Sequence, residues 1–212
     1  MGRKRGSRSH DYDAKRAEMA RRIYRCLVDG QGPSLNAMAD YIGVSRPTLR
    51  HYFGDRQGAV RTALELAAKV SAMRFGPIAE IEVNSADGAL REALEYYVAA
   101  WRDHGLGRLH RVGLEAGLGD AEIGLVYLEQ ALEPVLSAFE TLIRRLQDAS
   151  LLALGDPRAL AFATVGPVHL AMLHQSALRG AESHPVDLRV LIDEVTARIS
   201  GPRIRFRTPF DP

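Results

Sequence analysis

The chain has 212 residues, of which 46% are hydrophobic and 25% are charged, a composition typical of a globular protein with a sizeable core. Its only cysteine, Cys26, excludes an intramolecular disulfide and any metal site built from several cysteines. No apolar run approaches the roughly 18 residues of a membrane span, and the N-terminus lacks the apolar core of a signal peptide. We therefore expect a cytoplasmic protein with no membrane partner.

The net charge of +2 is unevenly distributed along the chain. Residues 1–56 carry 12 Lys+Arg and 6 Asp+Glu, a net charge of +6, whereas the remaining 156 residues have a net charge of −4. A basic head on a mildly acidic body is typical of proteins whose head binds nucleic acid.

Residues 1–10 contain Arg3, Lys4 and Arg5 among glycines and serines, with no apolar residue after Met1. Such a segment cannot pack against a core, so we expect a disordered basic arm. The arm would either reach phosphates and the minor groove of DNA or serve as a solubilising tail, and the sequence favours neither alternative.

Residues 13–29 are predicted to form the first helix, because apolar side chains recur at helical spacing up to Gly30. The predicted buried stripe consists of Ala17, Ala20, Ile23, Tyr24 and Leu27. Arg16, Arg22 and Arg25 are expected to face away from this stripe, and some of them would lie along the DNA backbone.

Residues 34–53 are predicted to form two short helices joined by a tight turn. Ser34 can cap the first helix and Gly43 can end it, while Ser45 can cap the second helix with Pro47 in its first turn. The inward face of the second helix carries Leu49, Tyr52 and Phe53. Its outward face carries Arg46, Pro47, Arg50 and His51.

This pair of helices predicts a helix-turn-helix whose second helix enters the major groove of DNA. The alternative is an ordinary pair of helices with a solvated basic face. Arg46 and Arg50 are the expected base readers, and Pro47 would pack on a thymine methyl. Thr48, Tyr52 and Arg56 are better placed for phosphates. The full set of expected DNA-binding residues is Ser34, Asn36, Ser45, Arg46, Pro47, Thr48, Arg50, His51, Tyr52 and Arg56, with Arg3, Lys4 and Arg5 from the arm.

The stretch GVSRPTLRHYFGDRQGAV resembles the TetR family of bacterial transcriptional regulators, and the resemblance is specific over about residues 12–75. Arg56 stands where the family usually has a lysine that contacts phosphate, whereas Arg50 replaces a residue that is most often tyrosine. Gly58 and Ala59 depart mildly from the usual Ala-Leu. The matching residues are Gly43, Val44, Ser45, Thr48, Leu49, Tyr52 and Phe53.

The rest of the chain is predicted to be helical, so the expected fold class is all-α. Asp55 can cap a helix over 56–75, and Pro134 should kink or split a long helical pattern over 120–149. Other helices are expected from about 85, over 107–115, over 157–179, and from His184–Pro185 to about 200. The predicted domains are the arm 1–10, the DNA-binding head 11–55, a linking helix 56–76, an effector-binding and dimerisation body 77–201 and a C-terminal coil 202–212.

Residues 157–179 are apolar nearly all round the helix, so both sides must be covered. Together with the last helix, over 186–200, this segment predicts a four-helix interface in a homodimer, an arrangement that the TetR resemblance also implies. A charge at Ala171 or Val195 is expected to disrupt association. The alternative is a fully buried central helix in a monomer.

No sequence motif for catalysis or cofactor binding was found, so no enzyme activity and no cofactor are predicted. His104 and His110 with Glu115 leave a metal site open, but solvated or core histidines are the favoured interpretation. Aromatic and histidine side chains of the body form either plain core or, as the TetR resemblance implies, a pocket for a small and mostly apolar effector. The expected effector-binding residues are Tyr97, Trp101, His104, His110, Tyr127, Phe139, His169 and Met172.

The sequence therefore leaves three functional hypotheses. The favoured one is a dimeric repressor that binds a near-palindromic site on double-stranded DNA and is released by an effector. The second is a DNA-binding dimer without a small ligand, and the third is an enzyme with a helical body.

Overall fold

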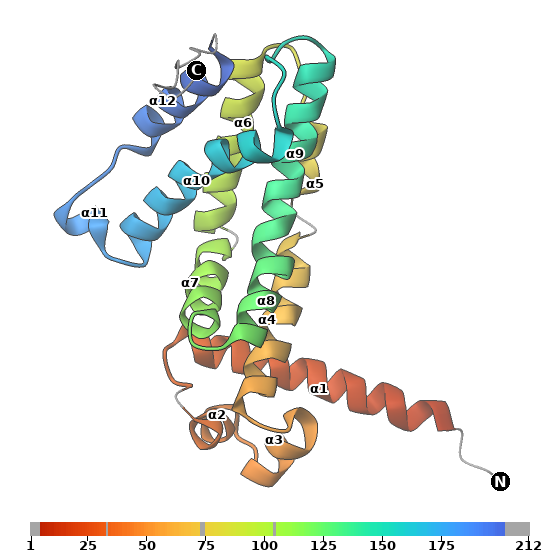
Figure 1. Cartoon of the computed structure of the whole chain (residues 1–212). Helices are drawn as coiled ribbons and strands as arrows, with labels where there is room; N and C mark the ends of the chain where they lie inside the picture. The colour runs from red at the N-terminus through yellow and green to blue at the C-terminus, as the bar shows by residue number, and fades with distance from the viewer. Residues whose placement is uncertain (1–4, 33, 73–74, 104, 202–212) are drawn as a thin grey trace, which may run out of the picture. The chain divides into compact units, whose positions relative to one another are not determined.

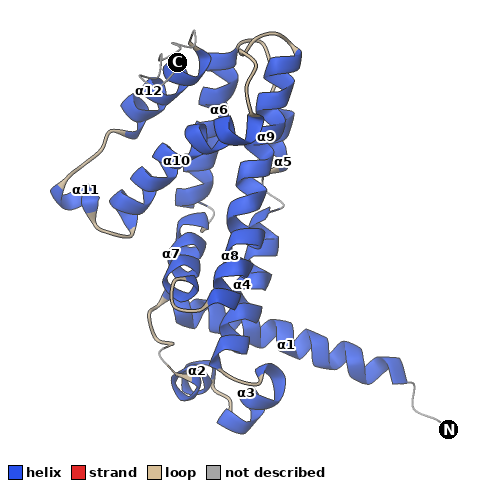
Figure 2. Cartoon of the chain, viewed as in Figure 1, coloured by secondary structure: helices blue, strands red, loops and turns tan. Residues whose placement is uncertain are grey.

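The structure is a computed structural model, and it describes residues 5–32, 34–72, 75–103 and 105–201. Every regular element in these residues is a helix, so the all-α prediction is confirmed (Figure 2). The described residues fall into two compact units, one drawn from Met1–Arg74 and His104–Pro134, the other from Phe75–Asp103 and Val135–Pro212. No helix within these ranges is both long and apolar enough to cross a membrane.

The first unit combines the N-terminal helices with a group that comes later in the chain (Figure 1). The core side chains of this unit that are at most 1% exposed include Ala20, Ile23, Met38, Ile42, Leu49, Val60 and Leu64. Its helices are α1 (Arg5–Val28), α2 (Leu35–Ile42), α3 (Arg46–Phe53), α4 (Arg56–Ala72), α7 (Leu106–Gly117), α8 (Ala121–Tyr127) and the π-helical turn η1 (Leu128–Leu132).

The helices α7 and α8 belong to this first unit, although the sequence assigned them to the body. Two glycines allow them to approach closely: a Cβ on Gly117 would lie 2.9 Å from Cα of Gly124. Two arginines attach them to the N-terminal helices. Arg111 donates to the backbone carbonyl of Val28 at the end of α1, and Arg61 of α4 pairs with Glu122 of α8 at 2.7 Å. Glycine is usually a signal of a turn or loop in a sequence, but Gly117 and Gly124 here allow two helices to pack closely.

The second unit packs around aromatic and leucine side chains that are completely buried, among them Leu90, Leu94, Tyr97, Phe139 and Leu142. Its helices are α5 (Gly76–Glu80), α6 (Ala86–Asp103), α9 (Glu133–Asp148), α10 (Pro157–Ser176), α11 (Gly180–Ser183) and α12 (Leu188–Ser200).

The first and last helices begin at residues several positions away from those that the sequence predicted. The first helix begins at Arg5 instead of residue 13, because extending an existing helix costs little and Lys15 pairs with Asp11 one turn earlier at 3.9 Å. The last helix begins after Asp187 instead of at His184–Pro185, since the Asp187 carboxylate accepts the N–H groups of Arg189 and Val190.

The predicted break at Pro134 is present. The helical pattern after Asp120 runs through α8, changes to π-helical spacing in η1, and resumes as α9, in which Pro134 is the second residue. Proline lacks a backbone N–H and its ring crowds the preceding turn, so a wider turn just before it is physically reasonable.

Candidate nucleic-acid interface and effector site

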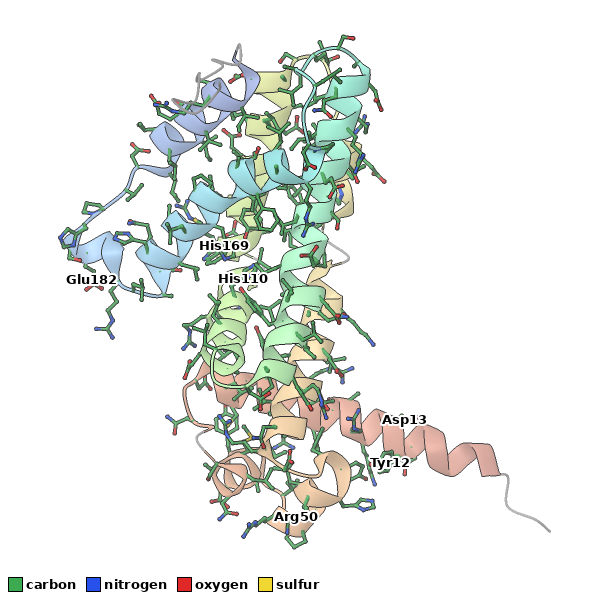
Figure 3. The ribbon with its side chains drawn as sticks, viewed as in Figure 1. Tyr12, Asp13, Arg50, His110, His169 and Glu182 are labelled. Carbon is green, nitrogen blue, oxygen red and sulfur yellow. The ribbon has the colours of Figure 1, made fainter. Side chains whose placement is uncertain are left out.

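The helix α3 has one buried face and one exposed face, as its sequence pattern predicts. Leu49 and Phe53 are buried, whereas Arg46, Pro47, Arg50 and His51 are exposed. Arg50 is labelled on this surface in Figure 3. The exposed face therefore presents two guanidinium groups, an imidazole and a flat apolar ring to the solvent.

The helix begins at a fixed point because Ser45 caps it. The Ser45 hydroxyl accepts the backbone N–H of Thr48 at 3.2 Å and lies 2.7 Å from the Thr48 hydroxyl. Ser34 caps α2 in the same way, accepting the N–H of Ala37 at 3.2 Å, and Gly43 ends α2 in the left-handed conformation at φ 70°. Both caps and the turn glycine were predicted, so the turn between α2 and α3 follows local sequence rules.

The C-terminal end of α3 is held by Tyr12 and Arg16 of α1. The sequence prediction gave Tyr12 no role and placed Arg16 away from the buried stripe. The Tyr12 ring stacks on the Tyr52 ring with centroids 4.7 Å apart and planes at 22°. Arg16 donates from Nε to the Tyr52 carbonyl at 3.2 Å and from Nη2 to Thr62 Oγ1 at 2.8 Å. The expectation that Arg16 faces away from the core was therefore wrong. The missed signal was spacing: Tyr12 and Arg16 stand one turn apart and continue the buried stripe at Ala20.

Arg56 lies at the start of α4, where the sequence placed a phosphate contact. Its Nε donates to the backbone carbonyl of Gly32 at 3.1 Å, and the side chain lines a cavity of about 310 Å³ within the first unit. Part of its hydrogen-bonding capacity is thus already used inside the protein. A phosphate contact through its remaining N–H groups stays a prediction.

The other expected DNA-binding residues are placed as follows. Ser34 and Asn36 are exposed at the start of α2, and Tyr52 and Thr48 are half-buried on α3. Arg3 and Lys4 lie outside the described residues. Arg5 is the first residue of α1, so the expectation of disorder through residue 10 is wrong for the described part, 5–10, which is helical.

Five of the expected effector-binding residues lie together in the second unit. The Tyr97 hydroxyl is 2.7 Å from His169 Nδ1, and the Trp101 ring meets the His169 ring edge-on at 5.2 Å. Phe139 meets Tyr97 edge-on at 6.5 Å, and Met172 is 3% exposed. Burial lowers the pKa of His169 to about 4, so this imidazole is neutral at neutral pH. These rings pack on one another as a closed cluster.

The second unit also has an open groove beside that cluster. This groove of about 990 Å³ is lined by α6, α10, α11, the segment that joins α11 to α12, and the first residues of α12. Trp101 and Met172 form part of its wall, together with Val98, Leu188 and Ile192. Its charged side chains are Glu95, Arg102, Asp103, Asp187 and Arg189.

Two of the remaining expected effector-binding residues, His110 and Tyr127, belong to the first unit. His110 Nδ1 lies 2.7 Å from the Tyr127 hydroxyl, and both side chains are buried. Burial raises the pKa of Tyr127, which keeps its hydroxyl protonated. Gly113 makes room for the Tyr127 ring, since a Cβ there would lie 2.2 Å from ring carbon Cδ2. His104 lies outside the described residues, and no three His, Cys, Asp or Glu side chains in the described ranges are placed to hold a metal ion.

No protein-family model and no curated protein sequence matches this chain. Solved structures do match it along most of its length. A Rhodococcus protein assigned to the TetR family of transcriptional regulators aligns over 88% of this chain and 100% of its own, at 15% identity and a TM-score of 0.68. The chain has the TetR fold.

Two further structures support this likeness. The transcriptional regulator FadR from Bacillus subtilis, solved in complex with stearoyl-CoA, matches at 14% identity and a TM-score of 0.62, over 84% of this chain and 96% of its own. A Mesorhizobium loti protein assigned to the TetR family matches at 18% identity and a TM-score of 0.58, over 86% of this chain and 93% of its own. The resemblance seen in residues 12–75 of the sequence therefore extends to the whole TetR fold.

Proposed function

We propose that this protein is a DNA-binding transcriptional regulator in the cytoplasm, and that α3 is the helix that reads DNA. The observation that carries the proposal is the exposed face of α3, where Arg46, Pro47 and Arg50 project from a short helix capped at its start and buried on its other side. A short helix supported in this way fits the major groove of B-DNA. The TetR fold adds support, because several of the matching structures are of transcriptional regulators.

The contacts that we propose divide into base reading and positioning. Arg46 and Arg50, one turn apart, can each bond bidentately to the O6 and N7 atoms of a guanine, and Pro47 can pack on a thymine methyl. Thr48 and Tyr52 would contact phosphates, which fix the position of the helix without reading sequence. Ser34 and Asn36 would add contacts from the start of α2.

We propose that the protein acts as a homodimer through α10 and α12. Large apolar side chains remain exposed on these helices: Phe162 is 51% exposed, Leu170 67% and Val190 57%. Ala171 and Val195 are each only 7% exposed, so a charge there would disturb the protomer itself and is a poor test of association. Two heads related by a two-fold axis would bind two half-sites about one DNA turn apart, or a multiple of that distance.

We propose that a mostly apolar effector binds in the second unit and releases the protein from DNA. The groove of about 990 Å³ offers the volume, and Trp101 and Met172 offer apolar walls. The stearoyl-CoA complex of FadR makes acyl compounds the first candidates. The second hypothesis, a DNA-binding dimer without a small ligand, would leave this groove without function.

Selection of duplexes from a random DNA pool with purified protein tests the DNA-binding proposal. We expect a near-palindromic site, and we expect Arg46→Ala or Arg50→Ala to cost about 1–3 kcal/mol on that site and to relax preference at one base position. If both variants bind the selected duplex as tightly as the wild type does, α3 is not the reading helix.

The effector proposal is tested separately with long-chain fatty acids and acyl-CoA. Trp101 is the only tryptophan of the chain, so its fluorescence reports on the wall of the groove. A true effector must weaken DNA binding, and the selected duplex must weaken effector binding by the same factor. A compound that binds equally well with and without DNA is not an effector, and the lack of any effector would favour the second hypothesis.

A further inference from the structure

The C-terminal end of α3 is held by side chains of α1, one of which also bonds to α4. Arg16 is half-buried and is held in three ways. Its Nε donates to the Tyr52 carbonyl at 3.2 Å, its Nη2 donates to Thr62 Oγ1 at 2.8 Å, and its guanidinium carbon stands 5.5 Å from the centre of the Phe53 ring. One guanidinium therefore joins α1, the last turn of α3 and the second turn of α4.

The last turn of a helix offers a natural place for a cation. Its backbone carbonyls have no partner within the helix, and the helix dipole makes this end negative. Arg16 satisfies one such carbonyl with a charged donor, which is stronger than a neutral one. Its planar group also has N–H donors pointing in fixed directions, so it sets an angle between α3 and α4 as well as a distance.

The partner on α4 is itself held in place. The Thr62 hydroxyl donates to the carbonyl of Gly58 at 2.8 Å, so its oxygen is oriented to accept from Arg16. Thr62 is only 8% exposed. A buried threonine cannot touch DNA, so any effect of Thr62 on DNA recognition must pass through other residues.

Tyr12 supports the same end of α3 one turn earlier on α1. Its ring stacks on Tyr52 and lies edge-on to His51 at 5.8 Å, with the planes at 89°. Tyr12 is labelled on α1 in Figure 3. The helix α1 therefore contacts α3 in two ways: Arg16 bonds to the backbone carbonyl of Tyr52, and Tyr12 stacks on the Tyr52 ring.

We propose that Arg16 is a positioning residue for DNA recognition: together with Thr62 it sets the orientation of α3, and it contacts no DNA itself. The inference rests on the proposed DNA-binding function. Reading bases requires that Arg46 and Arg50 reach two base edges at once, so a small rotation of α3 loses one contact while leaving most phosphate contacts in place. Arg16 therefore controls the preference for the selected site over random DNA.

The test uses the full chain, with the duplex selected by the wild type and a scrambled duplex of the same length. Arg16→Met and Thr62→Val should each lower the affinity ratio between the two duplexes by about 5–150-fold, the value of one bidentate base contact. The two changes should not add fully in the double variant, because both remove the contact between Arg16 and Thr62. Arg144→Met and Thr141→Val, which remove similar exposed groups from α9, are the matched controls and should leave the ratio unchanged.

The salt dependence of binding separates this role from a phosphate contact. If Arg16 contacted a phosphate, Arg16→Met would weaken both duplexes equally and reduce the salt slope by about one, and Thr62→Val would have no effect. A loss of melting temperature with an unchanged affinity ratio would show that the contact only stabilises the fold. Either result overturns the inference while the DNA-binding function stands. A wild-type protein that selects no sequence would overturn both.

Discussion

Replacing Gly58 with alanine should damage the junction between α3 and α4. A Cβ at position 58 would lie 2.1 Å from the backbone carbonyl oxygen of Phe53, the last residue of α3. Ordinary contact between such atoms needs about 3.5 Å, so the two helices must separate by roughly 1 Å or more. A backbone carbonyl cannot turn aside as a flexible side chain can. The Gly58 N–H also bonds to the Asp55 carboxylate at 2.8 Å, which holds the glycine in place.

Two terms of opposite sign set the size of the effect. Alanine is favoured over glycine inside a helix by about 0.8–1 kcal/mol, which would stabilise the variant. Forcing an extra methyl group into a packed site costs about 1–3 kcal/mol, and the rigid neighbour places this site toward the upper end. We expect a net loss of about 1–2 kcal/mol. For a chain of this length that corresponds to roughly 2–8 °C in melting temperature.

Urea unfolding and thermal melting measure this loss, and binding to the selected duplex measures its consequence for α3. Gly76→Ala is the matched control, because a Cβ at position 76 would meet no atom within 4 Å. We expect the control to be neutral or slightly stabilising and to bind DNA normally. A Gly58→Ala variant as stable as the wild type would show that α3 and α4 do not meet as described.

Two further predictions concern the second unit. Leu170→Glu, at a side chain that is 67% exposed, should convert the proposed dimer into a folded monomer in sedimentation experiments. The control Leu118→Glu, at an 86% exposed leucine of the first unit, should leave the dimer intact, and a wild-type protein that is monomeric at micromolar concentration would contradict the interface. Burial lowers the pKa of His169 to about 4, so between pH 6.5 and 4 the unfolded chain binds more protons than the folded chain does. The contribution of His169 to the free energy of unfolding should therefore be complete above pH 6.5 and should fall by up to about 3 kcal/mol as the pH drops to 4. His169→Gln should flatten this dependence in urea unfolding measured at several pH values, and an unchanged slope would show that another group is responsible.

Local sequence rules predicted the parts of the candidate site that depend on neighbouring residues. The caps at Ser34 and Ser45, the left-handed turn at Gly43 and the buried positions of α3 all follow from spacing within about ten residues. The break at Pro134 is equally local, since proline removes one donor from its own helix.

Contacts between distant segments could not be predicted in this way. Arg16 and Thr62 are far apart in the sequence, and a charged residue on a helix is by default assigned to the solvent. The glycines at 113 and 117 read as signals of a loop, because their use in close packing depends on which helix lies opposite. The expected effector residues Tyr127 and Phe139 both fit a helical stripe, yet they belong to different units. Periodicity shows that a side chain is buried but not which partner buries it.

Three features meet at the C-terminal end of α3 and help to set the position of this helix. Gly58 permits the carbonyl of Phe53 to approach α4, Thr62 bonds back to the Gly58 carbonyl, and Arg16 joins Thr62 to the carbonyl of Tyr52. The three share residues, since Gly58 lies against the end of α3 and also bonds to Thr62, and Thr62 bonds to Arg16, so a change at one of them is expected to alter the geometry of the other two. We expect a movement of α4 that loosens this group to rotate α3 without unfolding it. In a regulator of the proposed kind, this group is where a change in α4 would become a change in DNA recognition.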